Sequence, residues 1–279
     1  LMVSRMTRAG ATSGSIPFAA TGAAMAAASA GPLCGAALRH VVVTGSTNAD
    51  LVAEARAGDR GVAVLVADHQ TAGRGRRDRR WDDTSGGTLL VSLRLPVSGD
   101  GARGPTEAAH DAVAAVGAAA RAACARFVPV PVSTKWPNDV VGLGGPGPGK
   151  LAGVLADLVS GPEPVVVVGL GCNVEPVVTQ PDATSLRQCG AGDVDRDRLL
   201  AAVIEELAPF LVDPGMVHRE LVAHSATVGR VVRVELTDGS VLDGTATGLA
   251  ADGRLEVTTP DGGRRSIATG DVVSSRPAG

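Results

Sequence analysis

Aromatic side chains and lysines are nearly absent from this chain. Aromatics make up 2% of its 279 residues and there is no tyrosine, so its core must be built from Val, Leu, Ala and Ile. Of 26 basic side chains only Lys135 and Lys150 are lysines, and the other 24 are arginines. Lysine is a compact point charge, whereas arginine is a wide planar fork. The two lysines either occur by chance in an arginine-biased composition or occupy positions in a narrow anion-binding site.

Paired cysteines, long apolar runs and a strong net charge are also missing. The four cysteines lie far apart with no C-x2-C pair, which excludes a zinc site of that kind and a disulfide framework. This favours a reducing cytosol. No segment reaches the roughly 18 apolar residues that span a bilayer. A net charge of −3 and a pI near 6.0 argue against nucleic-acid binding through the overall field. We therefore expect a cytoplasmic protein without nucleic-acid or membrane partners.

The composition changes twice along the chain, which predicts three regions. Residues 1–37 form an Ala/Gly-rich tract, broken by Pro17, Ser29 and Pro32, that is too weakly apolar for a signal peptide. We expect it to be a disordered extension. Residues 38–225 are predicted to form one α/β domain, and residues 226–279 a small β domain.

Apolar patterning predicts the elements of both domains. Strands are expected at 39–43, 61–67, 88–95, 128–133, 150–159 and 164–170, and helices at 46–58, 106–127 and 194–212. From Val228 the sequence pattern changes to short β-branched runs separated by Asp-Gly pairs, which are strong turn signals. The pairs begin at Asp238, Asp243, Asp252 and Asp261 and predict a small antiparallel barrel or meander.

Two stretches at element ends admit both a structural and a ligand-binding interpretation. Ser46-Thr47-Asn48 opens a helix, and Thr47 followed by Asp50 fits a capping box. Hydroxyls at a helix start are equally well placed to hold a small polar ligand. Gly169-Leu170-Gly171-Cys172-Asn173 is either a tight strand exit or a place where a flat ligand approaches the backbone.

An arginine-rich stretch follows the second strand, with five arginines between Arg74 and Arg80. It matches neither a dinucleotide-binding fingerprint nor a P-loop. It could be a solvated basic loop, a nucleic-acid contact or a loop that becomes ordered around a phosphate. Trp81 is the one aromatic beside it, which is little for bases to stack on. Phosphate capture fits best.

The segment from Lys135 to Asp139 reads Lys-Trp-Pro-Asn-Asp, and Pro137 ends regular structure there. This directs Asn138 and Asp139 into a turn. A Gly/Pro-rich hairpin at 144–149 leads to Lys150, at the mouth of the next strand.

Together these stretches resemble the biotin protein ligases. The resemblance rests on five motifs in family order: Ser-Thr-Asn at 46–48, Gln-Thr-Ala-Gly-Arg-Gly-Arg-Arg at 70–77, Lys-Trp-Pro-Asn-Asp at 135–139, Lys-Leu-Ala-Gly at 150–153 and Gly-Leu-Gly-Cys-Asn at 169–173. It implies an α/β (α+β) catalytic domain like that of class II aminoacyl-tRNA synthetases, followed by a small C-terminal SH3-like β-barrel. It also implies a monomer or weak homodimer.

The activity that the resemblance implies has two steps. Biotin and ATP with Mg²⁺ form biotinyl-5'-AMP, and a lysine of the biotin carboxyl carrier domain of an acyl-CoA carboxylase then accepts the biotin. The implied biotin contacts are Ser46, Thr47, Asn48, Gln70, Arg74, Gly75, Arg76 and Lys150. The implied catalytic residues are Lys150, Arg74 and Arg76. The nucleotide side is assigned Lys135, Asn138, Asn173 and Arg276, and Asp139 is the candidate Mg²⁺ partner.

Two departures from the family pattern bear on these expectations. Asp78 stands where the family often has glycine, and its charge could pair with Arg76 or Arg79 and weaken phosphate affinity. Residues 1–38 are too short and too Ala/Gly-rich for the winged-helix DNA-binding domain of some members, so we expect no repressor.

Two other functions remain open. A lipoate–protein ligase shares the fold and the adenylation logic, but its Arg-Arg-x-Gly-Gly-Gly stretch does not occur here. A non-catalytic binder of RNA or protein could use the basic loop and the small barrel. It would show salt-sensitive nucleic-acid binding and no ATP–pyrophosphate exchange.

Overall fold

The computed structural model describes residues 24, 27, 33–77, 79–83, 86–97, 104–143, 149–177 and 179–277. The expected N-terminal extension and the 144–149 hairpin lie largely outside this set, and Asp78 lies wholly outside it.

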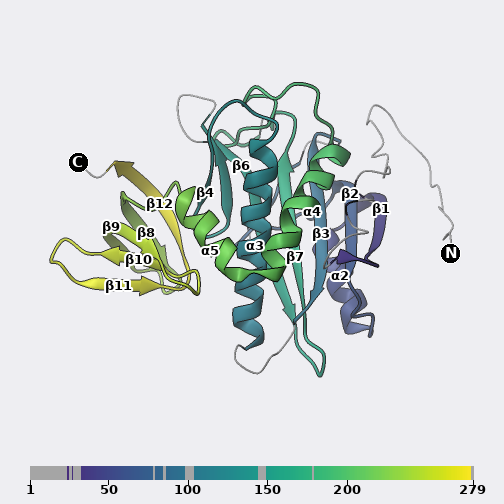
Figure 1. The fold of residues 1–279 in the computed structure, drawn as a ribbon, viewed down its shortest axis with the longest axis horizontal. Helices are drawn as coiled ribbons and strands as arrows, with labels where there is room; N and C mark the ends of the chain where they lie inside the picture. Colours follow the sequence, from purple (N-terminus) through teal and green to yellow (C-terminus); the bar gives the residue numbers. More distant parts are fainter. Residues whose placement is uncertain are drawn as a thin grey trace.

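A seven-stranded sheet forms the body of the molecule (Figure 1). Its first two strands pair in parallel, and every other neighbouring pair is antiparallel. Across the sheet the strands are β1 (Ala37–Thr44), β2 (Ala63–Gln70), β3 (Thr88–Pro96), β7 (Val165–Asn173), β6 (Gly149–Val159), β5 (Asp139–Gly142) and β4 (Val132–Lys135). The predicted strands are confirmed, with the one expected at 128–133 displaced towards Lys135.

Helices cover the two faces of this sheet unequally. α3 (Pro105–Ala125) and α4 (Arg196–Val212) lie side by side across one face (Figure 1). Buried alanines of α3 let it pack closely against the sheet. α5 (Pro214–Ala223), which sequence patterning missed, follows α4. None of the helices in the described ranges is long and apolar enough to cross a membrane.

The short helix α2 (Thr47–Arg56) packs on the opposite face. Leu51, Val52 and Ala55 are buried there against Leu65 and other strand residues. Ser46, not Thr47, is the N-cap, because its hydroxyl accepts from the Ala49 N–H. The Thr47 side chain is therefore released for other contacts. The part of this sheet face beyond the N-terminus of α2 holds the cavity described below.

A five-stranded antiparallel sheet follows, in the order β11-β10-β9-β8-β12. The strands are β8 (Arg230–Leu236), β9 (Val241–Leu249), β10 (Leu255–Thr258), β11 (Arg264–Ile267) and β12 (Gly270–Pro277). Gly239, Gly253 and Gly262 adopt positive φ in tight turns, as their Asp-Gly pairs predict. The prediction is wrong for Asp243-Gly244, which lies inside β9. A Cβ on Gly244 would sit 2.6 Å from the Thr258 carbonyl oxygen, so this glycine permits close strand packing.

Trp136 joins the two sheets. It follows β4 of the first sheet, but its side chain is 8% exposed and packs in the core of the second with Val232, Val234 and Leu255. Its Nε1 donates to the Gly253 carbonyl at 3.1 Å. The segment that carries Lys135 and Asn138 is therefore held by the C-terminal sheet.

Candidate active site

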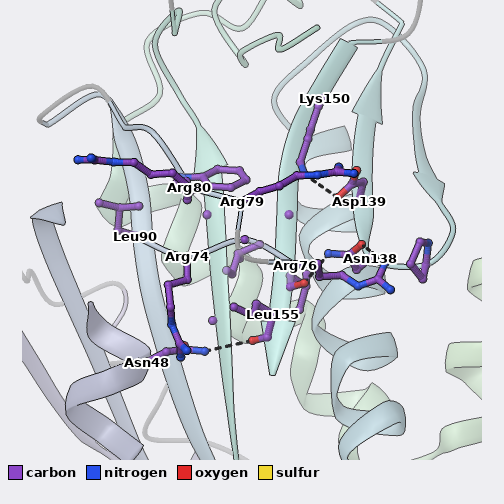
Figure 2. Close-up of a pocket in the computed structure, with 18 of the residues that line it drawn as sticks. Asn48, Arg74, Arg76, Arg79, Arg80, Leu90, Asn138, Asp139, Lys150 and Leu155 are labelled. Atoms are coloured by element: carbon purple, nitrogen blue, oxygen red, sulfur yellow. Dashed lines mark hydrogen bonds and ion pairs between the residues drawn. The ribbon is translucent and has the colours of Figure 1, made fainter. Parts of the chain in front are cut away.

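A cavity of about 440 Å³ opens between the N-terminus of α2, the arginine loop (residues 74–80) and β12. Most of the residues selected from the sequence line it, although they come from four separate stretches. They are Ser46, Thr47, Asn48, Gln70, Arg74, Gly75, Arg76, Lys135, Asn138, Asp139 and Lys150. Figure 2 shows side chains from these stretches converging on one space.

One end of the cavity is a set of hydrogen-bonded polar side chains, which we call the polar floor: Thr47, Asn48, Gln70 and Ser92. Gln70 Oε1 accepts from the Thr47 N–H at 2.7 Å. The Thr47 and Ser92 hydroxyls lie 2.7 Å apart, and Ser92 donates to Asn48 Oδ1 at 2.5 Å. All four residues are buried, so these polar groups are paired with one another instead of with bulk water.

The arginine loop crosses the cavity and rests on the C-terminal sheet. Arg76 Nη1 lies 2.8 Å from Asp271 Oδ1 and 3.2 Å from the Gly270 carbonyl oxygen. Arg77 and Arg79 pair with the other oxygen of Asp271 at 3.4 and 3.0 Å. Burial lowers the pKa of Arg76, against the opposing effect of Asp271. One carboxylate thus contacts three guanidinium groups, and Glu235 Oε2 lies 3.5 Å from Arg77 Nη1.

Arg77 has a left-handed backbone, with φ of 53°. This conformation is uncommon for a residue with a long side chain. Its guanidinium Nη2 donates to the Glu235 and Leu236 carbonyls at 2.9 and 3.3 Å. The fit of the loop against β8 stabilises the unfavourable backbone.

Lys150 lines the cavity between Asp139 and Trp81. Its Nζ lies 2.8 Å from Asp139 Oδ1 (Figure 2). The same nitrogen lies 5.4 Å from the centre of a Trp81 ring. A Cβ on Gly153 would approach both the Trp81 ring and the Lys150 ammonium, at 2.9 and 3.3 Å. Gly171 also lies against the Trp81 ring with no space for a Cβ. The glycines of the predicted motifs thus make room for an indole in this structure.

The residues assigned to the nucleotide side are not all brought together. Asn138 donates to the Val154 carbonyl at 2.7 Å and faces Arg76 at 3.4 Å, and Lys135 also lines the cavity. Asn173 is buried beside the cavity, where its Nδ2 donates to the Thr184 carbonyl. Arg276 is exposed on β12 and is not among the lining residues.

Four further residues belong to this site and were not selected from the sequence: Trp81, Ser92, Asp157 and Asp271. Ser92 and Asp157 sit within strands, where a lone polar residue carries no motif. Asp157 accepts from Arg74 and Asn48, and Asp271 holds the arginine loop. The one available signal was alternation: Gly153, Leu155 and Asp157 share a strand face.

Carboxylates suited to a metal ion are few here. The described ranges contain no group of three or more His, Cys, Asp or Glu side chains that could hold a metal. Asp139 is paired with Lys150.

Two family models match the chain. The model of the biotin/lipoate A/B protein ligase family matches residues 47–173, and that of the biotin protein ligase C terminal domain matches residues 227–274. The first range contains all residues of the five motifs described above except Ser46.

Similar proteins are found among curated sequences and solved structures. The biotin–[acetyl-CoA-carboxylase] ligase of Mycobacterium tuberculosis is 38% identical, over 85% of this chain and 88% of that protein. The bifunctional ligase/repressor BirA of Escherichia coli is 31% identical, over 65% of this chain and 55% of that protein. The biotin protein ligase from Aquifex aeolicus in complex with biotin and ATP is 26% identical, with a TM-score of 0.69 over 87% of this chain and 99% of that chain.

Proposed function

This chain belongs to the biotin protein ligase family, and from that premise we propose that it activates biotin with ATP and transfers it to a carrier protein. The observation that carries the proposal is the mixed lining of the cavity. The neutral polar floor and the cations Lys150, Arg76 and Arg79 line the same space. A ligand with an uncharged polar head and a reacting carboxylate matches this combination.

In the first step a carboxylate oxygen of biotin attacks the α-phosphorus of ATP. The new C–O–P bond forms as the bond to pyrophosphate breaks. Two anions must meet, and negative charge builds on the phosphoryl oxygens. Lys150 is placed to neutralise this charge, exchanging part of its contact with Asp139 for substrate oxygens. We assign Arg76 and Arg79, which both contact Asp271, to the leaving pyrophosphate, because it needs cations.

Mg²⁺ bound to the ATP phosphates would supply further charge neutralisation, with Asp139 as the candidate protein ligand. Mg²⁺ commonly relies on one or two carboxylates plus substrate phosphates. Lys135 and Asn138 line the same side of the cavity, and we assign them to the nucleotide. Asn173 and Arg276 do not line the cavity, so they would contact the nucleotide only if their side chains moved towards it.

In the second step the amine of a carrier lysine attacks the acyl carbon of biotinyl-5'-AMP. An amide forms and AMP leaves with the electron pair of the broken C–O bond. The mixed anhydride must be kept from water until the carrier arrives. We assign this shielding to the arginine loop, which already spans the cavity and contacts β12.

We infer that the acceptor is the biotin carboxyl carrier domain of an acyl-CoA carboxylase. We place the reaction in the cytoplasm, consistent with free thiols at Cys124 and Cys172 whose Sγ atoms lie 3.6 Å apart. A monomer or weak homodimer remains our expectation for the assembly.

The test is ATP–pyrophosphate exchange with biotin, with lipoate as the parallel substrate. We expect exchange with biotin alone. Exchange with lipoate alone would move this chain to the lipoate branch of the family. If neither acid supports exchange, the ligase proposal is wrong, and salt-sensitive RNA binding becomes the function to measure.

A further inference from the structure

Asp157 links two parts of the cavity that are far apart in sequence. It lies on β6, seven residues after Lys150. Its Oδ2 accepts from Asn48 Nδ2 at 3.0 Å and from Arg74 Nη2 at 3.1 Å, and its Oδ1 lies 3.3 Å from the same Arg74 nitrogen. One carboxylate therefore joins the start of α2 to the arginine loop.

The carboxylate also decides which way the Asn48 amide faces. Asp157 and the Leu155 carbonyl can only accept hydrogen bonds, and both are within reach of the same Asn48 nitrogen, at 3.0 and 3.3 Å. The amide must therefore turn its NH₂ towards β6 and its oxygen towards Ser92. Figure 2 shows Asn48 joined to Leu155, with Arg74 directed towards the same place.

The orientation of the Asn48 amide determines the direction of the next hydrogen bonds in the polar floor. Ser92 uses its single proton on Asn48 Oδ1 at 2.5 Å. The single proton of the Thr47 hydroxyl is then used within the floor, either on Ser92 across the 2.7 Å contact or on Gln70 Oε1 at 3.0 Å. Gln70 Oε1 also accepts from the Thr47 backbone N–H. The Thr47 hydroxyl thus has lone pairs and no proton for a ligand, so it selects a ligand that brings an N–H.

Arg74 depends on the same carboxylate. Its side chain is 53% exposed, and the two oxygens of Asp157 are its hydrogen-bonding partners in the described part of the chain. An exposed arginine has many rotamers of similar energy. Pairing with Asp157 keeps the guanidinium beside Asn48 and the polar floor.

We propose that Asp157 is a positioning residue for the acid substrate. It sets the hydrogen-bond direction of the polar floor and holds Arg74 beside it, although it is not itself among the residues lining the cavity. The inference rests on the proposed function for the identity of the ligand, whose cyclic urea presents N–H donors. It predicts that Asp157 governs biotin affinity and leaves ATP affinity unaffected.

The test is Asp157→Asn, which keeps the shape but removes the charge and adds a donor that lets the Asn48 amide turn over. We expect the KM for biotin in pyrophosphate exchange to rise about tenfold, since one oriented polar contact is commonly worth that factor. The kcat and the KM for ATP should stay within about twofold. Titration calorimetry with biotin alone should show the same loss.

Two further variants separate positioning from simple destabilisation. Asp243→Asn removes the same charge from an exposed arginine pair in the C-terminal sheet, where Asp243 and Arg233 make two contacts of 2.9 Å. It should leave both KM values unchanged. Asp157→Glu keeps an acceptor-only carboxylate and should recover most of the biotin affinity. In Arg74→Ala, the effect of Asp157→Asn should be smaller than in the parent.

The inference is overturned by an unchanged KM for biotin in Asp157→Asn. Equal losses in biotin and ATP affinity with a lower melting temperature would also overturn it, because that pattern indicates general damage. These outcomes are distinct from failure of the proposed function, in which the parent protein itself shows no biotin-dependent exchange.

Discussion

At the scale of single residues, the cavity is selective about the shape of its cations. Lys150 stands between Asp139 and the Trp81 ring, in contact range of Gly153. An ammonium fits this gap, whereas a planar guanidinium would need the indole or the strand to move. The arginines instead lie on a loop, where there is space for a planar guanidinium group. This accounts for a lysine here in a chain that otherwise uses arginine.

Replacement of Lys150 tests this reasoning. Lys150→Ala should reduce biotin-dependent pyrophosphate exchange by more than tenfold, because the charge that balances the meeting anions is lost. Lys150→Arg should recover little, since charge alone does not restore the geometry. Circular dichroism should show an intact fold in both. Full activity in Lys150→Arg would show that the narrow gap is unimportant.

The cysteines offer a test of burial at the same scale. The contact with Cys124 and burial together raise the pKa of Cys172 well above its usual range, so its reactive thiolate is scarce at neutral pH. Cys124 and Cys189 are also buried, whereas Cys34 is exposed. Iodoacetamide at pH 8 should therefore modify Cys34 alone in the native protein. Mass spectrometry after digestion would reveal it, and rapid labelling of Cys172 would contradict this packing.

At the scale of elements, the arginine loop is organised by a strand from the other sheet. Asp271 of β12 contacts Arg76, Arg77 and Arg79, which would otherwise repel one another. The sequence alone suggested a loop that stays disordered until an anion arrives. The structure shows how a protein carboxylate provides part of that charge balance before any phosphate binds.

Removal of the Asp271 charge should therefore loosen the loop. We expect Asp271→Asn to increase the rate of tryptic cleavage within residues 74–80 severalfold, because three guanidinium groups lose their common partner. Peptide mapping over time would measure the rate, with Asp243→Asn as the control. An unchanged cleavage rate would mean that the backbone contacts of Arg77 suffice to hold the loop.

At the scale of the whole molecule, the two sheets act as one unit because of Trp136. The residue belongs to a cavity motif by sequence, yet its indole fills the core of the C-terminal sheet. Lys135 and Asn138, on either side of it, line the cavity. The position of these two lining residues therefore depends on a segment about 90 residues further along the chain, where Thr227 Oγ1 accepts from the Trp136 N–H.

Truncation of this indole should weaken both folding and activity. Trp136→Ala leaves a hole in a buried core, with an expected cost of about 3–5 kcal/mol. The melting temperature should fall by roughly 6–12 °C for a chain of this size. Calorimetry would follow the transition, and pyrophosphate exchange should fall through a higher KM for ATP. A stable variant with normal KM would show that the C-terminal sheet does not position this segment.

Much of the fold could be predicted from the sequence because its elements are locally encoded. Apolar runs placed the strands of the first sheet except β5, which begins at Asp139 where a turn was expected. Asp-Gly pairs placed three of the four expected turns, and motif order placed most of the cavity lining. The failures had separate causes. Gly244 looked like a turn residue, but it is a packing position against Thr258, and that contact exists only after β9 and β10 pair. The short helix α5 carried no motif.

What the sequence determined by itself was therefore the set of elements and the chemistry of the site: lysines, arginines and small polar residues at family spacing. What only the tertiary structure decided was which of these groups form hydrogen bonds and ion pairs with one another. Asp157 faces Arg74 and Asn48 because β6 passes beneath both, and Asp271 reaches the arginine loop because Trp136 docks its sheet there. A carboxylate's partner depends on distances of a few ångströms in space, and these are set by packing between segments far apart in the chain.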